Sequence, residues 1–123
     1  MNVVLWVLQW VLAVAFVVAG VLKATQPTEK LAAQLPWVRD FSTGTVRFIG
    51  VVEILGGLGL VLPALTGIAP ILTPLAATGI GIIMILAAVV HARRKETSGI
   101  VVNVVILVLA ALVAWGRFGP YAL

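Results

Sequence analysis

The sequence predicts an all-α integral membrane protein, a bundle of four transmembrane helices with a short interfacial amphipathic segment between helices one and two. Three observations favour this fold class. Hydrophobic residues make up 63% of the 123-residue chain and charged residues 10%, whereas a soluble domain carries about 45–50% and about 25%. The mean hydropathy is +1.23. The apolar residues also fall into four runs, each close to the ~20 residues that span a bilayer.

This composition excludes several classes of protein. A soluble fold of this length keeps much of its area in water, so a soluble enzyme, a nucleic-acid-binding protein and a disulfide-stapled secreted domain do not fit. The net charge of +4 comes from eight Lys and Arg that stand between the apolar runs. We therefore expect them to set orientation and to contact lipid headgroups, not nucleic acid. Without cysteine, the chain has no thiol for redox chemistry or metal binding.

The predicted spans differ in how they begin and end. The first is interrupted only by Gln9 and lacks the basic start of a signal peptide, so we expect a retained helix. The second ends at Pro63. For the third, Thr73 is the expected cap and Pro74 the first helical residue, because Pro lacks only a donor that would be unpaired there. Together they form a single domain, 1–123, with spans at about residues 3–22, 45–62, 72–91 and 99–116.

The connection between the first two spans is long enough to need structure of its own. Leu31, Leu35 and Val38 recur at four- and three-residue spacing beside charged residues, and Pro36 interrupts the pattern. This is typical of a short, broken amphipathic segment at the membrane surface, with Trp37 as interface anchor. The alternative is an ordinary solvated loop.

The basic residues are distributed unevenly between the two sides of the predicted bundle. The side with both termini carries only Arg117, whereas the other carries six Lys or Arg, or seven with Arg47. The positive-inside rule then predicts a multi-pass protein of the cell (inner or plasma) membrane, with both termini outside and the basic loops cytoplasmic. The six are Lys23, Lys30, Arg39, Arg93, Arg94 and Lys95.

Small residues at four-residue spacing favour close helix packing, which in lipid needs near approach of backbones. Gly50 and Gly57 flank Glu53 on one face and leave room for a neighbouring helix or a ligand. Gln9 is a candidate interhelical hydrogen-bonding residue. The other expected packing pairs are Ala15 and Ala19, Ala77 and Gly81, and Ala110 and Ala114.

Glu53 is the sharpest candidate for function. An ionisable residue in the bilayer costs about 2.5–3.5 kcal/mol on insertion scales, so it is normally paired and faces the bundle interior. Lys23 or His91 on another helix is an easier partner than Arg47, which lies six positions away on the same helix. The predicted ligand-binding residues are Lys23, Arg47, Glu53, His91 and Asn103.

Each of the other four also has a structural interpretation. Lys23 and Arg47 are at span ends, where basic side chains commonly reach the headgroups. His91 stands beside a loop, and Asn103 is suited to a hydrogen bond between helices. No catalytic residue and no metal site is predicted, because the chain carries no phosphate-binding loop, paired carboxylates or His, Asp and Glu set. For the isolated chain, the sequence therefore favours a non-enzymatic role over an enzymatic one.

In several segments the chain resembles the DoxX-like family of small four-helix membrane proteins. The segments follow one another in order over nearly the whole length. They are Phe16-Val-Val-Ala-Gly20-Val-Leu-Lys23, Arg47-Phe-Ile-Gly50-Val-Val-Glu53, Gly59-Leu-Val-Leu-Pro63 and Ala-Val-Val-His91-Ala-Arg-Arg94.

The resemblance implies a limited set of functions. The family takes its name from a small subunit linked to quinone-dependent sulfur and terminal-oxidase complexes, and relatives are tied to oxidoreductase assemblies and receptor-assembly chaperoning. The leading hypothesis is thus an accessory protein that binds a quinone or lipid-like molecule in a polar pocket and supports a larger membrane complex. One alternative is a non-enzymatic assembly factor or chaperone. Another is a homo-oligomeric small-molecule transporter, because four helices enclose little pore.

Overall fold

The computed structural model describes residues 1–123 and is all-helical, which confirms the predicted fold class. Four helices are long and apolar enough to cross a membrane, since 22 residues of α-helix span about 33 Å. A short helix and a 3₁₀ turn lie between the first two. In chain order the elements are α1 (Asn2–Thr25), α2 (Thr28–Gln34), η1 (Pro36–Asp40), α3 (Thr43–Thr66), α4 (Leu72–Arg93) and α5 (Thr97–Phe118).

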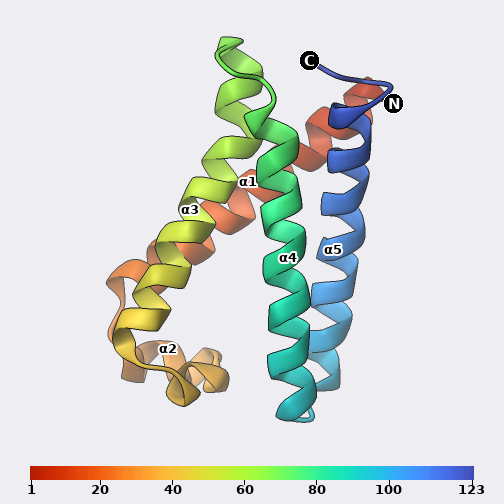
Figure 1. Ribbon diagram of the computed structural model, residues 1–123. Coiled ribbons are helices and arrows are strands. Elements are labelled where there is room, and N and C mark those ends of the chain that lie inside the picture. The colour runs from red at the N-terminus through yellow and green to blue at the C-terminus, as the bar shows by residue number, and fades with distance from the viewer.

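The four long helices form two packed pairs, α1 with α3 and α4 with α5 (Figure 1). Helix α1 runs diagonally across the molecule, so its start lies beside α5 and its end beside α3. Leu5 accordingly packs on Gly116 of α5, and Gly20 packs on Gly50 of α3. Both chain termini lie at one end of the bundle (Figure 1).

Apolar side chains of all four long helices form one core. Leu5, Leu60, Ile80 and Val113 are at most 1% exposed. Many other Val, Leu and Ile side chains are about half exposed. In a soluble protein such a surface would be unfavourable, whereas here it is the surface that faces lipid. The composition therefore fits the fold, which has an apolar core between the long helices and an apolar exterior.

The second span is longer than predicted, because Pro63 lies inside α3 and does not end it. Proline has no amide hydrogen, so the carbonyl four residues earlier, on Gly59, loses its helical partner. Thr73 Oγ1 of α4 donates to that carbonyl at 3.1 Å. The prediction of Thr73 as the cap of α4 is thus wrong, because the helix begins at Leu72 and the hydroxyl satisfies the freed carbonyl instead. Helix α3 ends at Thr66 and is capped by Gly67, whose φ of +72° is left-handed.

The small-residue pairs are correct in part. Ala77 and Gly81 are buried in α4, and Ala110 is fully buried in α5. Ala15 is exposed, however, so its pair is not the packing site of α1. That helix uses its other face, where Ala13 and Gly20 meet α3.

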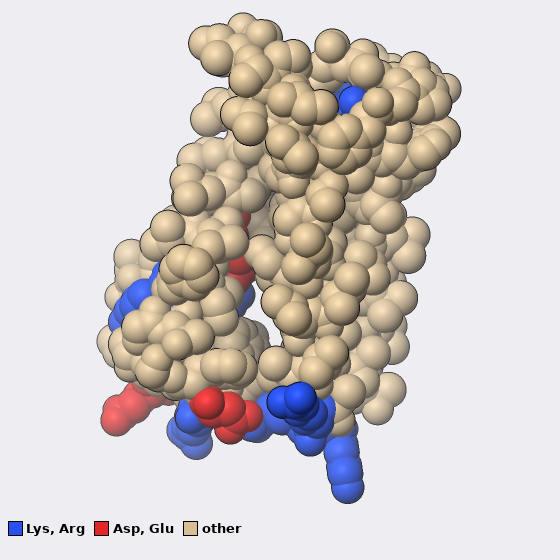
Figure 2. Space-filling view, viewed as in Figure 1, with Lys and Arg blue, Asp and Glu red and all other residues tan.

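The long connection is folded and does not form an open loop. In it, α2 and η1 lie at the end of the bundle away from the termini (Figure 1). The apolar residues predicted to share a face do so: Leu31 and Val38 are buried together with Val46 of α3, and Leu35 packs against them. Figure 2 shows that the charged side chains gather at this same end of the molecule. We call it the basic end, because seven of the eight Lys and Arg belong to its loops and adjoining helix turns.

Candidate functional site

The site begins with a contact between two glycines. A Cβ atom on Gly20 would lie 2.5 Å from the carbonyl oxygen of Gly50, and one on Gly50 would lie 2.6 Å from that of Gly20. The backbones of α1 and α3 therefore touch, which only glycine allows at both positions. The space predicted beside Gly50 is filled by a neighbouring helix and not by a ligand. Gly57 repeats this contact higher on α3, against Ala13.

Three residues after each glycine come the two charges of the site. Lys23 Nζ lies 2.8 Å from Oε1 and 3.2 Å from Oε2 of Glu53. The side chains are 12% and 5% exposed, so the ion pair is largely buried between α1 and α3. Lys23 is thus the partner of Glu53, as one of the two predicted arrangements had it. Because a lone buried charge is costly, each residue makes the other tolerable.

Two further residues surround this ion pair. Arg47, six residues before Glu53 on α3, donates from Nη1 to the carbonyl oxygen of Lys23 at 2.8 Å. Trp37 of η1 lies near the ammonium, with its ring centroid 5.9 Å from Lys23 Nζ. Trp37 is half-buried and meets Phe41 edge-on. Residues from α1, η1 and α3 therefore converge on Lys23.

His91 and Asn103 belong to the other helix pair and contact neither Lys23 nor Glu53. His91 Nδ1 lies 3.0 Å from Glu96 Oε1, and its ring packs on Gly99, where a Cβ would be only 2.5 Å from the ring. Asn103 is buried in α5 and donates to the sulfur of Met84 at 3.4 Å. Its Oδ1 atom is buried without a hydrogen-bond partner. Only three of the five predicted residues therefore form one group.

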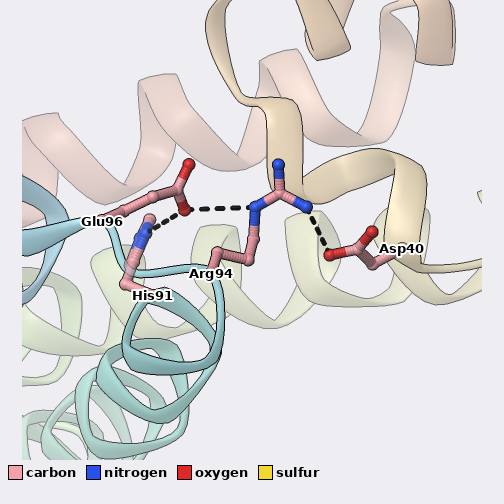
Figure 3. Close-up of polar contacts among 4 residues, drawn as sticks. All are labelled: Asp40, His91, Arg94 and Glu96. Carbon is pink, nitrogen blue, oxygen red and sulfur yellow. Dashed lines mark hydrogen bonds and ion pairs between the residues drawn. The ribbon is translucent and has the colours of Figure 1, made fainter.

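A second polar network joins the two halves of the molecule at the basic end (Figure 3). Glu96 Oε1 lies between His91 and Arg94, with Arg94 Nε at 3.2 Å. Arg94 Nη1 donates to Asp40 Oδ2 at 2.6 Å, which ties the α4–α5 turn to η1. This hydrogen bond to Asp40 raises the pKa of Arg94 above its ordinary value. Through alternating charges, the network links the segment formed by α2 and η1 to the α4–α5 pair.

Between the helix pairs the molecule is hollowed. Figure 2 shows a hollow in the half nearer the basic end, with acidic side-chain atoms on its wall. A separate apolar groove of about 490 Å³ runs between α3 and α4, within the usual range for ligand sites. It begins near Pro63 and ends at the level of Val52, next to Glu53 in sequence. Its lining includes Val52, Leu55, Gly56, Gly59, Ala76, Gly79 and Ile83.

Sequence reasoning missed three features of the site. Gly20 escaped notice as a contact residue, although it lies in the same Gly-x-x-charge pattern as Gly50 and Glu53. Arg94 entered only the count of basic residues, and neither Asp40 nor Glu96 was predicted to have a role. Arg117 entered only the charge count, yet it is 3% exposed. Nothing in the local sequence distinguishes a buried Arg from one that reaches the surface.

Comparison with known proteins assigns the family. The model of the DoxX-like family matches residues 7–113. The chain belongs to the DoxX-like family. No curated protein and no solved structure matches it.

Membership fits the geometry of the site. The matched range includes the Gly20–Gly50 contact, the Lys23–Glu53 ion pair and the turn between α4 and α5. This DoxX-like chain is a multi-pass membrane protein, since four of its helices are long and apolar enough to cross a bilayer. No three His, Asp or Glu side chains come together as a set that could hold a metal ion. What the arrangement offers is hydrogen-bonding and ionic groups inside an apolar bundle.

Proposed function

We propose that this DoxX-like protein is an accessory membrane protein that binds a quinone or a lipid-like molecule between its helix pairs and supports a membrane oxidoreductase assembly. The observation that carries the proposal is the buried Lys23–Glu53 ion pair. An ammonium group has three donors and a carboxylate about four acceptor sites, so the pair leaves capacity on both sides. A quinone carbonyl accepts from Lys23, and the hydroxyl of the reduced form donates to Glu53.

The apolar surroundings support a ligand with a long tail. The groove between α3 and α4 is lined mainly by aliphatic side chains and by glycines. It ends at Val52, in the helix turn that carries Glu53. Arg47 and Asn103 supply further polar groups at the same end of the bundle, and Asn103 Oδ1 is free to accept.

We further propose that the basic end faces the cytoplasm. Seven Lys and Arg stand at or near that end and one near the termini, and the positive-inside rule orients such a chain with its termini outside. The quinone head then lies in the cytoplasmic half of the membrane. A larger oxidoreductase complex that uses the same quinone pool is the partner this implies.

The test compares quinone binding to protein in nanodiscs, followed by tryptophan fluorescence quenching and by extraction of co-purified quinone. The variant is the double substitution Lys23→Met with Glu53→Gln, which removes both charges without leaving one unpaired. We expect at least a roughly tenfold loss of affinity, the size of a charge-assisted hydrogen bond. Arg93→Gln, at an exposed position of the basic end, is the matched control. Equal affinity of the wild type and the double variant would refute the proposal.

One observation favours the second candidate, a non-enzymatic assembly factor. Lys23 Nζ reaches both carboxylate oxygens of Glu53, and Arg47 holds the carbonyl of Lys23, so the polar groups also lock α1 onto α3. For an assembly factor, Glu53→Gln lowers stability but leaves partner association of the folded protein unchanged. Co-purification of the partner complex at permissive temperature separates the two functions.

A further inference from the structure

The end of the bundle opposite the ion pair holds a buried cation with no acidic partner. Arg117, in the last turn of α5, is 3% exposed. All four acidic residues of the chain lie elsewhere: two in the connection between α1 and α3, one within α3 beside Lys23, and one in the α4–α5 turn. A buried charge normally has a counter-ion, because desolvation alone is strongly unfavourable.

The guanidinium is held by neutral groups on three sides. Its Nε donates to Gln9 Oε1 at 2.8 Å, and Nη1 donates to Asn2 Oδ1 at 2.6 Å and to the Tyr121 carbonyl at 2.9 Å. Gln9 is fixed in turn, since its Nε2 donates to the carbonyl of Leu60 at 2.7 Å. The remaining nitrogen, Nη2, is buried and has no hydrogen-bond partner. The arginine is therefore fixed in place with part of its donor set unused.

The surroundings place this arginine at the depth of lipid headgroups. Three of the four tryptophans stand at this end, together with the only tyrosine, and Trp and Tyr concentrate where bilayer meets water. Trp6 lies against the guanidinium, with 5.5 Å from its ring centroid to the central carbon. Trp10 and Trp115 are about half exposed. The negative group most abundant at that depth is the phosphate of a phospholipid.

We propose that Arg117 forms a phosphate-binding site that takes the phosphodiester of a phospholipid from the leaflet on the side of the termini. The Nη2 group has no other acceptor, so it donates to a phosphate oxygen in a charge-assisted hydrogen bond. The C-terminal turn is the part that shifts to admit it. Gly119 and Pro120 are exposed, and the turn is held by the bond from Tyr121 N to the Gly116 carbonyl and by Arg117 itself.

This site is independent of the quinone proposal, because it lies at the other end of the bundle and uses none of the same residues. A purely structural role is the competing explanation: Arg117 would only tie α1 to α5 through Asn2 and Gln9. That role requires no phosphate, so a measurement of lipid binding distinguishes the two.

The experiment uses delipidated full-length protein in an uncharged detergent. Thermal unfolding and native mass spectrometry follow the addition of phosphatidylglycerol, of diacylglycerol with the same acyl chains, or of inorganic phosphate. We expect stabilisation and one tightly bound copy with phosphatidylglycerol, and neither with diacylglycerol. An equal effect of millimolar inorganic phosphate would mean that the site takes the free ion instead of the lipid. If diacylglycerol acts as well as phosphatidylglycerol, the phosphate site does not exist.

Two variants and a control assign the effect to this residue. Arg117→Gln removes the charge and should weaken the tight copy roughly tenfold or more, as loss of a charge-assisted pair does. Arg117→Lys keeps the charge but loses the planar guanidinium that Asn2, Gln9 and the Tyr121 carbonyl hold in place, and we expect intermediate binding. Arg93→Gln removes the same charge from the exposed basic end and should leave this copy in place. Unchanged binding by Arg117→Gln would overturn the proposal, and if that variant does not fold, the Lys variant and the lipid series decide.

Discussion

At the scale of single residues, the chain uses polar side chains sparingly and pairs nearly every one that it buries. Gln9, Thr73 and Arg47 each donate to a backbone carbonyl of another helix. In lipid no water is available to satisfy such groups, so each of these bonds fixes where two helices meet. Lys23 and Glu53 extend this rule to charges.

The ion pair gives a test that separates charge from packing. Glu53→Gln leaves Lys23 buried without its partner, and we expect a loss of about 3–5 kcal/mol in the free energy of unfolding. Lys23→Met together with Glu53→Gln removes both charges and should cost clearly less than the single change. Denaturant unfolding of the single and double variants in detergent measures the difference. A loss in the double variant as large as that in Glu53→Gln alone would mean that the cost does not come from an unpaired Lys23.

The residue scale also sets a limit on prediction from sequence. The partner of Glu53 could be limited in advance to Lys23 or His91, because a charge in an apolar background needs a partner and few were within reach. The position of His91 could not be predicted, because its contact with Glu96 depends on how the α4–α5 turn folds. In that turn Lys95 lies in the left-handed region, at φ +59°. Arg117 is buried because α1 crosses the bundle diagonally and brings Asn2 and Gln9 to it. The sequence pattern does not reveal the crossing angle of a helix.

At the scale of helices, glycine determines how closely α1 and α3 approach. We expect Gly50→Ala to force these helices apart, because its Cβ would meet backbone atoms of Gly20 and Ala24 at 2.6 and 2.7 Å. Overpacking of this kind costs about 1–3 kcal/mol. It should also lengthen the Lys23–Glu53 contact, one turn away.

A matched control lies on α4. A Cβ on Gly79 would have nothing within 4 Å, and Ala favours a helix over Gly by about 1 kcal/mol. Gly79→Ala should therefore leave stability unchanged or raise it, measured by thermal unfolding beside Gly50→Ala. If both variants lose stability equally, the loss does not come from the α1–α3 crossing.

The segment formed by α2 and η1 gives a second prediction at this scale. The Arg94–Asp40 bond is the polar tie between η1 and the α4–α5 turn. Because it raises the pKa of Arg94, the contribution of this pair is present below the ordinary arginine pKa and is lost only as pH rises beyond it. We expect Asp40→Asn to change global stability little, since ion pairs at the surface are screened by solvent. Amides of residues 28–40 should exchange faster with deuterium, as they should for the wild type at high salt. Unchanged exchange would mean that the apolar contacts of Leu31 and Val38 hold the segment alone.

The whole fold was the most predictable level, and the reason is physical. Four runs of apolar residues, long enough to span a bilayer, leave few alternatives once backbone groups must bond within each segment. The helix limits were less predictable. Pro63 predicts the end of a helix, but α3 continues past it because Thr73 of α4 donates a hydrogen bond to the carbonyl that proline leaves unpaired. That compensation comes from another helix, so only tertiary structure reveals it.

The orientation of the whole molecule is the last prediction, and the absence of cysteine makes it directly measurable. Lys95→Cys places a single thiol at the basic end, and Ala122→Cys places one beside the termini, both at exposed positions. In intact cells, a membrane-impermeant maleimide should label Ala122→Cys and spare Lys95→Cys, because the basic loops are retained on the cytoplasmic side. The reverse pattern would invert the bundle and put the quinone head in the outer half of the membrane. Labelling of both would indicate dual topology, and replacing Arg93, Arg94 and Lys95 with Gln should then increase the inverted fraction.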